Sequence, residues 1–254
     1  MTRLSVNLNK VALLRNQRDM PYPSVTAAAE AVVAAGAGGI TVHPRPDARH
    51  ITRRDVEEIA GLFRSKFRGD VEFNIEGYPA ADWLALVKAV RPHQATLVPD
   101  PPEAHTSEEG WDIPANAALL RRTIGELQAA GIRVSLFVEA DPAAVAAAKA
   151  VGADRVELYT GPYGHAFGGA QGAAVLAEVT AAGAAARREG LGLNAGHDLN
   201  LDNLPDLAAA LPWLDEVSIG HAFTADALRL GYAGAVAAYL AALAPARGQS
   251  HAVA

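Results

Sequence analysis

The chain has 254 residues, half of them hydrophobic, which suits one large α/β domain with a substantial buried core. It contains no cysteine, so disulfides and thiolate metal sites are excluded, and a reducing cytoplasm is the expected location. The formal net charge of −6 argues against a nucleic-acid-binding protein, which would more often be basic.

Nothing in the sequence indicates a membrane protein. No stretch of about 20 residues is free of charged residues and turn formers, so we expect no membrane span. The first predicted strand begins almost at Met1, which leaves no room for a signal peptide.

Eight short apolar runs recur along the chain, and seven of them are rich in Val, Ile, Leu or Phe, as strands buried on both faces are. They begin near residues 4, 39, 71, 95, 132, 154, 191 and 215. Alanine-rich stretches with helical spacing lie between them. Eight alternating β-α units predict a parallel α/β sheet closed into a (β/α)8 TIM barrel, with residues 1–254 forming a single domain.

Several of the predicted helices carry start and stop signals. Ser24 follows a proline, Thr52 and Asp55 have the spacing of a capping box, and Asp141 precedes a proline at the first helical position. Glycines are predicted to end other helices, at Gly36, Gly131, Gly152 and Gly190.

The two longest stretches predicted to be irregular are Pro99 to Trp111 and Gly161 to Gly169. Both follow strands, so both should lie at the active face of a barrel, where long loops are more often functional than accidental. The four glycines of the second stretch suggest that it is mobile.

Polar side chains lie in or directly after six of the apolar runs. A parallel barrel gathers the ends of its strands on one face, so these side chains should surround one pocket. Histidine is the usual proton shuttle near neutral pH, and three histidines lie at independent strand ends, which favours acid–base chemistry. His93, His105, His165 and His251 lack this placement and are assigned no role. The six positions are Asn7, His43, Glu76, Glu157, His197 and His221.

Strand parity separates the glutamates from the apolar residues of the third run. Glu72 and Glu76 share one face, toward the barrel interior, while Phe73 and Ile75 share the other. A buried ion-pair network with an arginine is the competing explanation for Glu72 and, less strongly, for Glu157. At Glu76, which ends its strand, a functional role is favoured.

Two glycine-containing turns, Ala195 to Asp198 and Ile219 to Ala222, follow the seventh and eighth runs. Loops in these positions commonly bind phosphate in TIM barrels through backbone N–H groups at a helix start. Positive charge gathers after the first two runs, which suits a small anion such as a phosphate ester. Those basic residues are Lys10, Arg15, Arg18, Arg45, Arg49, Arg53 and Arg54.

Two other catalytic strategies are disfavoured. A barrel metallohydrolase would have two histidines flanking one residue on its first strand, where this chain has Asn7 and Asn9, and no histidine pair has helical i, i+4 spacing. A lysine Schiff base is also disfavoured, because none of the four lysines lies within a strand and only Lys10 could reach the pocket.

Taken together, these residues resemble the pyridoxine 5′-phosphate synthase family, from Leu4 to roughly Leu240. The segments that carry the resemblance are Val6–Asn9, Leu14–Arg18, Gly39–Arg45, Arg49–Ile51, Asn74–Glu76, Val134–Phe137, Glu157–Gly161, Asn194–His197 and Ile219–Ala222.

The resemblance implies an eight-stranded α/β barrel with extra helices, usually an octamer, that uses no metal or organic cofactor. It implies condensation of 1-deoxy-D-xylulose 5-phosphate with 3-amino-2-oxopropyl phosphate to pyridoxine 5′-phosphate, phosphate and water. His43 and Glu76 would accept protons, His197 would donate one, and Glu157 would stabilise a charged transition state. The residues implied to hold the amino-ketone phosphate are Asn7, Arg18, Asp198, Gly220 and His221. Those implied to hold the deoxyxylulose phosphate are Asn9, Lys10, Arg45, His50 and Thr106, the last in a loop that would close over the site.

The sequence departs from the commonest family pattern in three places. Asn9-Lys10 replaces Asp-His, Pro101-Pro102 replaces a basic pair, and Asp198 replaces a glycine. An anionic Asp198 beside a phosphate would be unfavourable unless a cation or N–H donors intervene. Two alternatives remain open: a different TIM-barrel isomerase or aldolase acting on a phosphorylated ketose, and a catalytically inactive barrel that serves as a binding or scaffold protein.

Overall fold

The eight predicted strands are present and form one closed parallel barrel in sequential order, with β1 paired to both β2 and β8. The structure is a computed structural model that describes residues 1–67, 69, 71–100 and 109–244. The strands are β1 (Arg3–Asn7), β2 (Gly39–Val42), β3 (Glu72–Gly77), β4 (Gln94–Leu97), β5 (Arg133–Val138), β6 (Arg155–Tyr159), β7 (Gly192–Gly196) and β8 (Glu216–Ile219).

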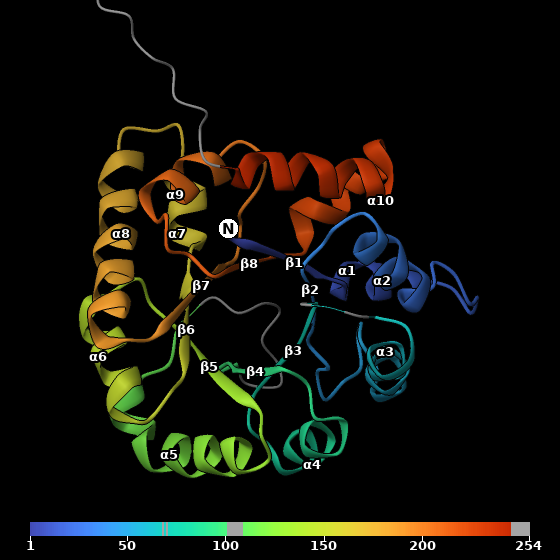
Figure 1. Ribbon diagram of the computed structural model, residues 1–254, viewed down its shortest axis with the longest axis horizontal. Coiled ribbons are helices and arrows are strands. Elements are labelled where there is room, and N and C mark those ends of the chain that lie inside the picture. Colours follow the sequence, from blue (N-terminus) through green and yellow to red (C-terminus); the bar gives the residue numbers. More distant parts are fainter. Residues whose placement is uncertain (68, 70, 101–108, 245–254) are drawn as a thin grey trace, which may run out of the picture.

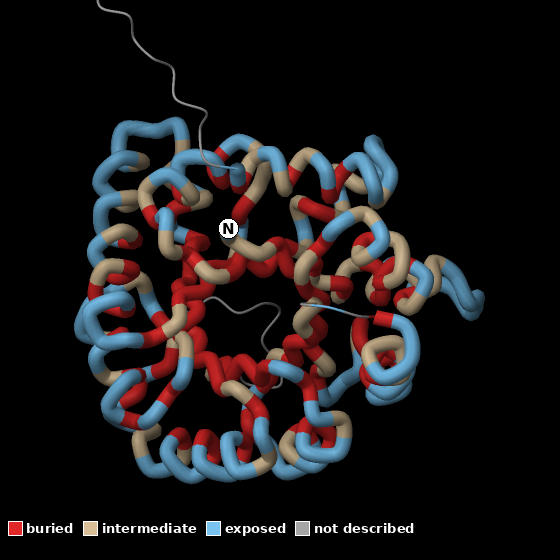
Figure 2. Tube along the Cα trace, viewed as in Figure 1, coloured by how far each residue is buried: buried red, intermediate tan, exposed pale blue. Residues whose placement is uncertain are grey.

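Helices surround the barrel, with their buried sides against the ring of strands and their exposed sides outward (Figures 1 and 2). Eight of them connect each strand to the next or follow β8: α2 (Val25–Ala34), α3 (Arg53–Ser65), α4 (Ala81–Val90), α5 (Ile113–Ala129), α6 (Pro142–Ala150), α8 (Gly172–Glu189), α9 (Leu204–Ala210) and α10 (His221–Leu243). The described chain has two further helices, α1 (Asn9–Arg15) after β1 and α7 (Gly161–Ala166) after β6. The prediction of a TIM barrel with extra helices is confirmed. None of the described helices is long and apolar enough to cross a membrane.

The predicted helix signals are present in the structure. The Ser24 hydroxyl accepts a hydrogen bond from the backbone N–H of Ala27, and Thr52 with Asp55 forms a complete capping box. Asp141 caps α6. The four predicted stop glycines all have positive φ, the backbone region that glycine adopts without a Cβ penalty; they are Gly36, Gly131, Gly152 and Gly190.

Polar side chains fill the middle of the barrel, as strand parity predicts. The Ser5 and Thr41 hydroxyls lie 2.7 Å apart, and the Thr96 hydroxyl donates to the Asn74 side-chain oxygen at 3.0 Å. Each of these side chains is buried and bonded to a neighbour, which offsets the cost of removing it from water.

The ion-pair network considered for Glu72 is confirmed. Glu72 begins β3, at the end of the barrel opposite the strand C-termini, and pairs with Arg3 at 2.6 Å, with Arg133, and with Arg155 at 3.8 Å. Burial opposes ionisation of Glu72, but Arg133, Arg155 and Arg3 outweigh it and hold the pKa of the carboxyl below its ordinary value. Glu72 therefore has a structural role, as the centre of an ion-pair network.

The prediction that Gly161 to Gly169 is irregular is wrong for its first part, because α7 occupies Gly161–Ala166. Its glycines allow close packing. A Cβ at Gly161 would collide with the Tyr159 ring, and one at Gly164 would lie 2.8 Å from the Cβ of Asp198. Most of the other predicted loop, residues 101–108, lies outside the described residues.

Candidate active site

A cavity of about 1370 Å³ opens at the C-terminal ends of the strands. It is lined by twelve of the predicted site residues: Asn7, Asn9, Lys10, His43, Arg45, His50, Glu76, Glu157, His197, Asp198, Gly220 and His221. Arg18 does not line it and lies in an exposed turn after α1. Thr106 lies outside the described residues. The roles of these residues remain predictions, but the barrel brings most of them around one space.

The end of β1 holds the first acid–base pair in place. The Asn7 side-chain oxygen accepts a hydrogen bond from the Asn9 backbone N–H at 3.0 Å, and its amide donates to Glu76 Oε2 at 3.4 Å. The Asn9 side-chain oxygen accepts from the His43 backbone N–H at 2.9 Å. His43 Nδ1 lies 3.7 Å from Glu76 Oε2, so the ends of β1, β2 and β3 meet at a histidine–carboxyl pair.

Both members of this pair are shifted toward their neutral forms. Burial, followed by the nearby positive charges, lowers the pKa of His43 well below its ordinary value. Burial, with Asp100 as the next cause, raises the pKa of Glu76 to about 8. At neutral pH the site therefore holds a neutral imidazole, able to accept a proton, beside a largely protonated carboxylic acid, so Glu76 would have to release its proton before it could accept one as the resemblance implies.

Glu157 on β6 is a second buried carboxyl of the cavity. Burial raises its pKa well above the ordinary value, and the negative charges of Glu76 and Glu216 act in the same direction. No described residue pairs with it as an ion partner, so the ion-pair explanation considered for Glu157 finds no support among the described residues. Gly196 lies against its carboxyl group, where a Cβ would collide with Oε1.

The loop after β2 carries Arg45, Arg49 and His50, which line the cavity. Arg45 Nη2 lies 2.6 Å from Asp100 Oδ2, and both side chains are nearly inaccessible. The His50 Nδ1 accepts a hydrogen bond from the Ile51 backbone N–H at 2.8 Å, so a neutral His50 carries its proton on Nε2. Burial, and then Arg45 and Arg49, lower the pKa of His50 to about 4.

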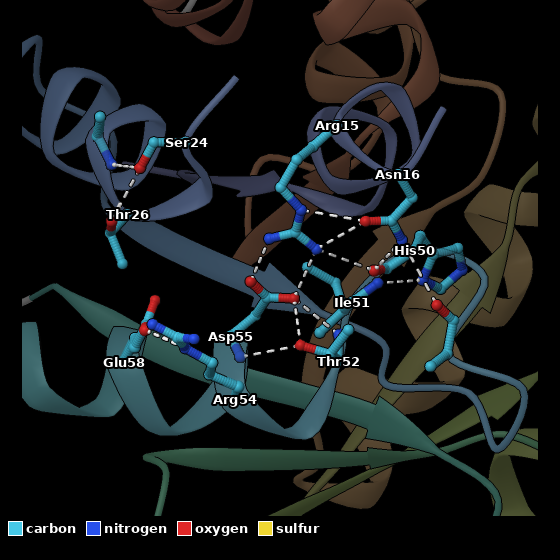
Figure 3. Close-up of polar contacts among 12 residues, drawn as sticks. Arg15, Asn16, Ser24, Thr26, His50, Ile51, Thr52, Arg54, Asp55 and Glu58 are labelled. Atoms are coloured by element: carbon cyan, nitrogen blue, oxygen red, sulfur yellow. Dashed lines mark hydrogen bonds and ion pairs between the residues drawn. The ribbon is translucent and has the colours of Figure 1, made fainter. Parts of the chain in front are cut away.

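Helix α1 anchors this loop from outside the cavity (Figure 3). Arg15 pairs with Asp55, the residue that completes the capping box of α3. The Asn16 amide donates to the backbone oxygens of Arg49 at 3.1 Å and His50 at 2.8 Å. The loop after β2 is therefore attached to α1 and to the start of α3. The residue patterns in the sequence did not reveal this supporting role of Arg15 and Asn16.

The ends of β7 and β8 face the cavity through the two predicted turns. Gly220 and His221 are the N-cap and first residue of α10, and both line the cavity, so the start of a helix, where backbone N–H groups lack intrahelical partners, borders the space. His197 and Asp198 follow β7 and also line the cavity.

Several residues in or beside the cavity were not assigned from the sequence. Asp100 does not line the cavity itself but pairs with Arg45, which does; it directly follows Val98-Pro99 after β4, and a search for polar residues after each strand would have found it. Arg49 was noted only as part of a basic group. His165 was assigned no role because it does not lie at a strand end, although α7 carries it to the cavity wall. Phe137, Tyr159 and Ser218 also line the cavity.

The cavity gives less support to the two alternative strategies, a lysine Schiff base and a metal site. Among the residues that the structure describes, Lys10 is the only lysine that lines the cavity, while Lys66 and Lys88 form surface ion pairs with Glu30 at 2.6 Å and Glu126 at 3.1 Å. Within the described residues, no group of three or more histidine, aspartate or glutamate side chains is arranged to hold a metal ion.

The comparisons with solved structures concern the fold. A 4-hydroxy-2-oxoglutarate aldolase superposes with a TM-score of 0.62 at 17% identity, covering 95% of this chain and 94% of that one. The phosphoribosylanthranilate isomerase of Thermotoga maritima gives a TM-score of 0.57 at 13% identity, covering 96% and 98%. At these identities the likeness shows a shared barrel and nothing about substrates.

Comparisons with protein families and curated sequences are more specific. The family model described as "Pyridoxal phosphate biosynthesis protein PdxJ" matches residues 4–245. The pyridoxine 5′-phosphate synthase of Mesorhizobium japonicum is 53% identical over 94% of this chain and 98% of its own length. That of Albidiferax ferrireducens is 53% identical over 97% and 99%. The chain therefore belongs to the PdxJ family of pyridoxal phosphate biosynthesis proteins.

Proposed function

We propose that this chain is an active pyridoxine 5′-phosphate synthase. It condenses 1-deoxy-D-xylulose 5-phosphate with 3-amino-2-oxopropyl phosphate and releases pyridoxine 5′-phosphate, inorganic phosphate and water. The observation that carries the proposal is the meeting of His43, Glu76, Glu157 and His197 around one cavity that is basic after β1 and β2 and rich in N–H donors after β8.

The two ends of the cavity suit two phosphorylated substrates. Asn9, Lys10, Arg45 and His50 lie after β1 and β2 and would hold the deoxyxylulose phosphate, with Thr106 joining them. The N-terminus of α10 would hold the phosphate of the amino ketone through Gly220 and His221, together with Asn7. Arg18 would reach this substrate only if the turn after α1 moved toward the cavity.

The protonation states of the unliganded site suit imine chemistry. The amino ketone supplies the amine, so no enzyme lysine is needed to attack the other substrate's carbonyl. Loss of water from the adduct leaves a cationic imine, and a neutral buried carboxyl such as Glu157 can ionise as that cation forms. His43, held neutral, can accept protons, and His197 can return them to departing water or phosphate.

Burial also protects the intermediates. His43 and Glu157 are almost fully buried at the strand ends, so imines bound against them would be shielded from water on that side. Each well-placed acid or base is expected to contribute about 10²–10⁴-fold to the rate.

The proposal also includes the location, the cofactor requirement and the assembly state of the enzyme. A single barrel domain would carry the activity, free in the cytoplasm, binding no nucleic acid or membrane and using no metal or organic cofactor. We propose that eight copies assemble, which would cover apolar side chains such as Leu228 and Tyr22 that stand 76% and 65% exposed. Light scattering of the purified chain measures the assembly mass.

The direct test is incubation of the purified protein with both phosphorylated substrates in the presence of a metal chelator. The expected result is pyridoxine 5′-phosphate and inorganic phosphate in equal amounts, with neither formed when one substrate is omitted. Consumption of one phosphorylated ketose alone would instead identify an isomerase or aldolase, and no conversion at all would favour an inactive scaffold.

A further inference from the structure

Two consecutive residues after β7 have left-handed backbone conformations, although neither is glycine. The φ angle is 85° at His197 and 56° at Asp198. Residues with a side chain seldom adopt this region, and they remain in it only where surrounding contacts impose it. Such positions gather at functional sites, so the contacts of this turn indicate what it holds in place.

Three neighbouring segments fix the turn. The Thr160 hydroxyl lies within hydrogen-bond distance of the His197 carbonyl oxygen, at 2.7 Å. The Asn203 amide donates to the Asp198 carbonyl oxygen at 2.9 Å. On α7, Gly164 lies so near Asp198 that a Cβ there would be 2.8 Å from the aspartate Cβ. The backbone is therefore held from both sides, and its side chains have defined neighbours.

This turn places the carboxylate of Asp198 beside His197, the predicted proton donor. Asp198 Oδ2 lies 3.4 Å from His197 Nδ1, and the Tyr159 ring packs edge-on against the imidazole at 5.3 Å between centroids. His165 Nε2 approaches the same carboxylate from α7, at 4.0 Å, but its side chain is 78% exposed. In unliganded enzymes catalytic hydrogen bonds are often long and shorten when substrate binds.

We propose that Asp198 is a positioning residue for His197. Its carboxylate accepts the Nδ1 hydrogen of the imidazole, which fixes the tautomer and ring orientation and directs Nε2 to the substrates. It also stabilises the imidazolium from which a proton is given. The proton-donor role of His197 rests on the proposed function, whereas the pairing of the two side chains does not.

A negative charge at Asp198 is better explained by pairing with His197 than by contact with a phosphorylated substrate. A carboxylate facing a phosphate group would repel it, whereas a carboxylate facing a histidine that becomes cationic attracts it. Among the described residues, the titratable side chains beside the pair are His165 on α7 and Tyr159 on β6, and the carboxyl of Glu157 lines the same cavity. His197 is both closer to the carboxylate than His165 and less exposed, with side chains 24% and 78% accessible.

The first test is nitrogen-15 NMR of the histidine rings under alkaline conditions, in the protein without substrates. Asp198→Gly removes the carboxylate and keeps a residue that adopts positive φ freely, and Asp202→Asn removes an exposed charge nearby as a matched control. The His197 signal is identified by its loss in His197→Asn. We expect protonated Nδ1 in the wild type and the control, and mixed tautomers in Asp198→Gly. Identical ring signals in the wild type and Asp198→Gly would overturn the pairing.

The second test is steady-state kinetics with both phosphorylated substrates. We expect Asp198→Gly to lower kcat about tenfold, with KM for the amino-ketone phosphate changed less than about threefold, because a positioning residue acts on the donor and not on binding. A changed KM with unchanged kcat would mean that Asp198 contacts substrate and would overturn the proposal. If the wild type forms no pyridoxine 5′-phosphate while the NMR result stands, the proposed function fails and the pairing survives.

Discussion

Replacing Glu76 with glutamine should change how the stability of this protein depends on pH. The Glu76 side chain is only 12% exposed, and burial raises its pKa to about 8, against 4.5 for an ordinary glutamate. The folded protein thus keeps a proton that the unfolded chain releases as the pH rises above 4.5. The free energy of unfolding must then fall with rising pH across this interval, because the unfolded state binds fewer protons than the folded state.

The size of the expected change in the free energy of unfolding follows from the difference between the pKa of Glu76 in the folded and unfolded states. Between pH 4.5 and 8 the contribution of Glu76 changes by about 1.4 kcal/mol per pH unit, which gives up to about 5 kcal/mol in total. Glutamine has nearly the shape of the protonated acid and does not ionise. We therefore expect Glu76→Gln to match the wild type near pH 4.5 and to exceed its free energy of unfolding by several kcal/mol at pH 8.

Urea unfolding of both proteins at a series of pH values measures this difference. Equal protein concentrations are required, so that any assembly contributes equally to both. The difference between the two free energies should grow steadily with pH, while the variant loses at least about 10² in turnover. A difference that stays constant from pH 4.5 to 8 would refute the claim that Glu76 is protonated in the resting site.

Three further changes test other parts of the site. His197→Asn should lower turnover by at least about 10², whereas Lys88→Ala, on the surface, should leave it nearly unchanged; near-normal turnover of the first variant would remove His197 from the mechanism. Asp100→Asn leaves the buried charge of Arg45 without its partner and should lower the free energy of unfolding by about 3 kcal/mol in urea titrations, and a loss below about 0.5 kcal/mol would contradict the pair's burial. Gly196→Ala places a methyl group against the buried glutamate of β6 and should lower turnover more than tenfold in the same assay, and full turnover would show that this glutamate can move freely.

The fold could be predicted from the sequence because its signals are local and repeated. Most strands are apolar runs with a polar residue in or directly after them, and helix boundaries such as Thr52 and Asp141 carry capping contacts within three residues. Where packing replaced a local signal, the prediction failed. Gly161 and Gly164 suggest mobility in the sequence, but the structure gives another reason for glycine at these positions. A Cβ at Gly161 would collide with Tyr159, and one at Gly164 would collide with Asp198.

The site was predictable only in part, for a related reason. The side chains proposed to be catalytic, such as His43 and His197, lie at strand ends, and the barrel rule alone places them together. The contacts that tune them come from residues distant in sequence: Asp100 reaches Arg45 across 55 residues, and Asn16 holds the His50 loop across 34. No local pattern contains that information, because it depends on loop paths and on side-chain direction.

The central claim is that one cavity holds two different phosphorylated substrates at the same time. Isothermal titration of the slow His197→Asn variant with each substrate, alone and after saturation with the other, tests this most directly. We predict one site per chain for each compound, with binding of the second undiminished when the first is already bound. Competition of the two compounds for a single site would contradict the claim and leave a barrel enzyme that acts on one phosphorylated substrate.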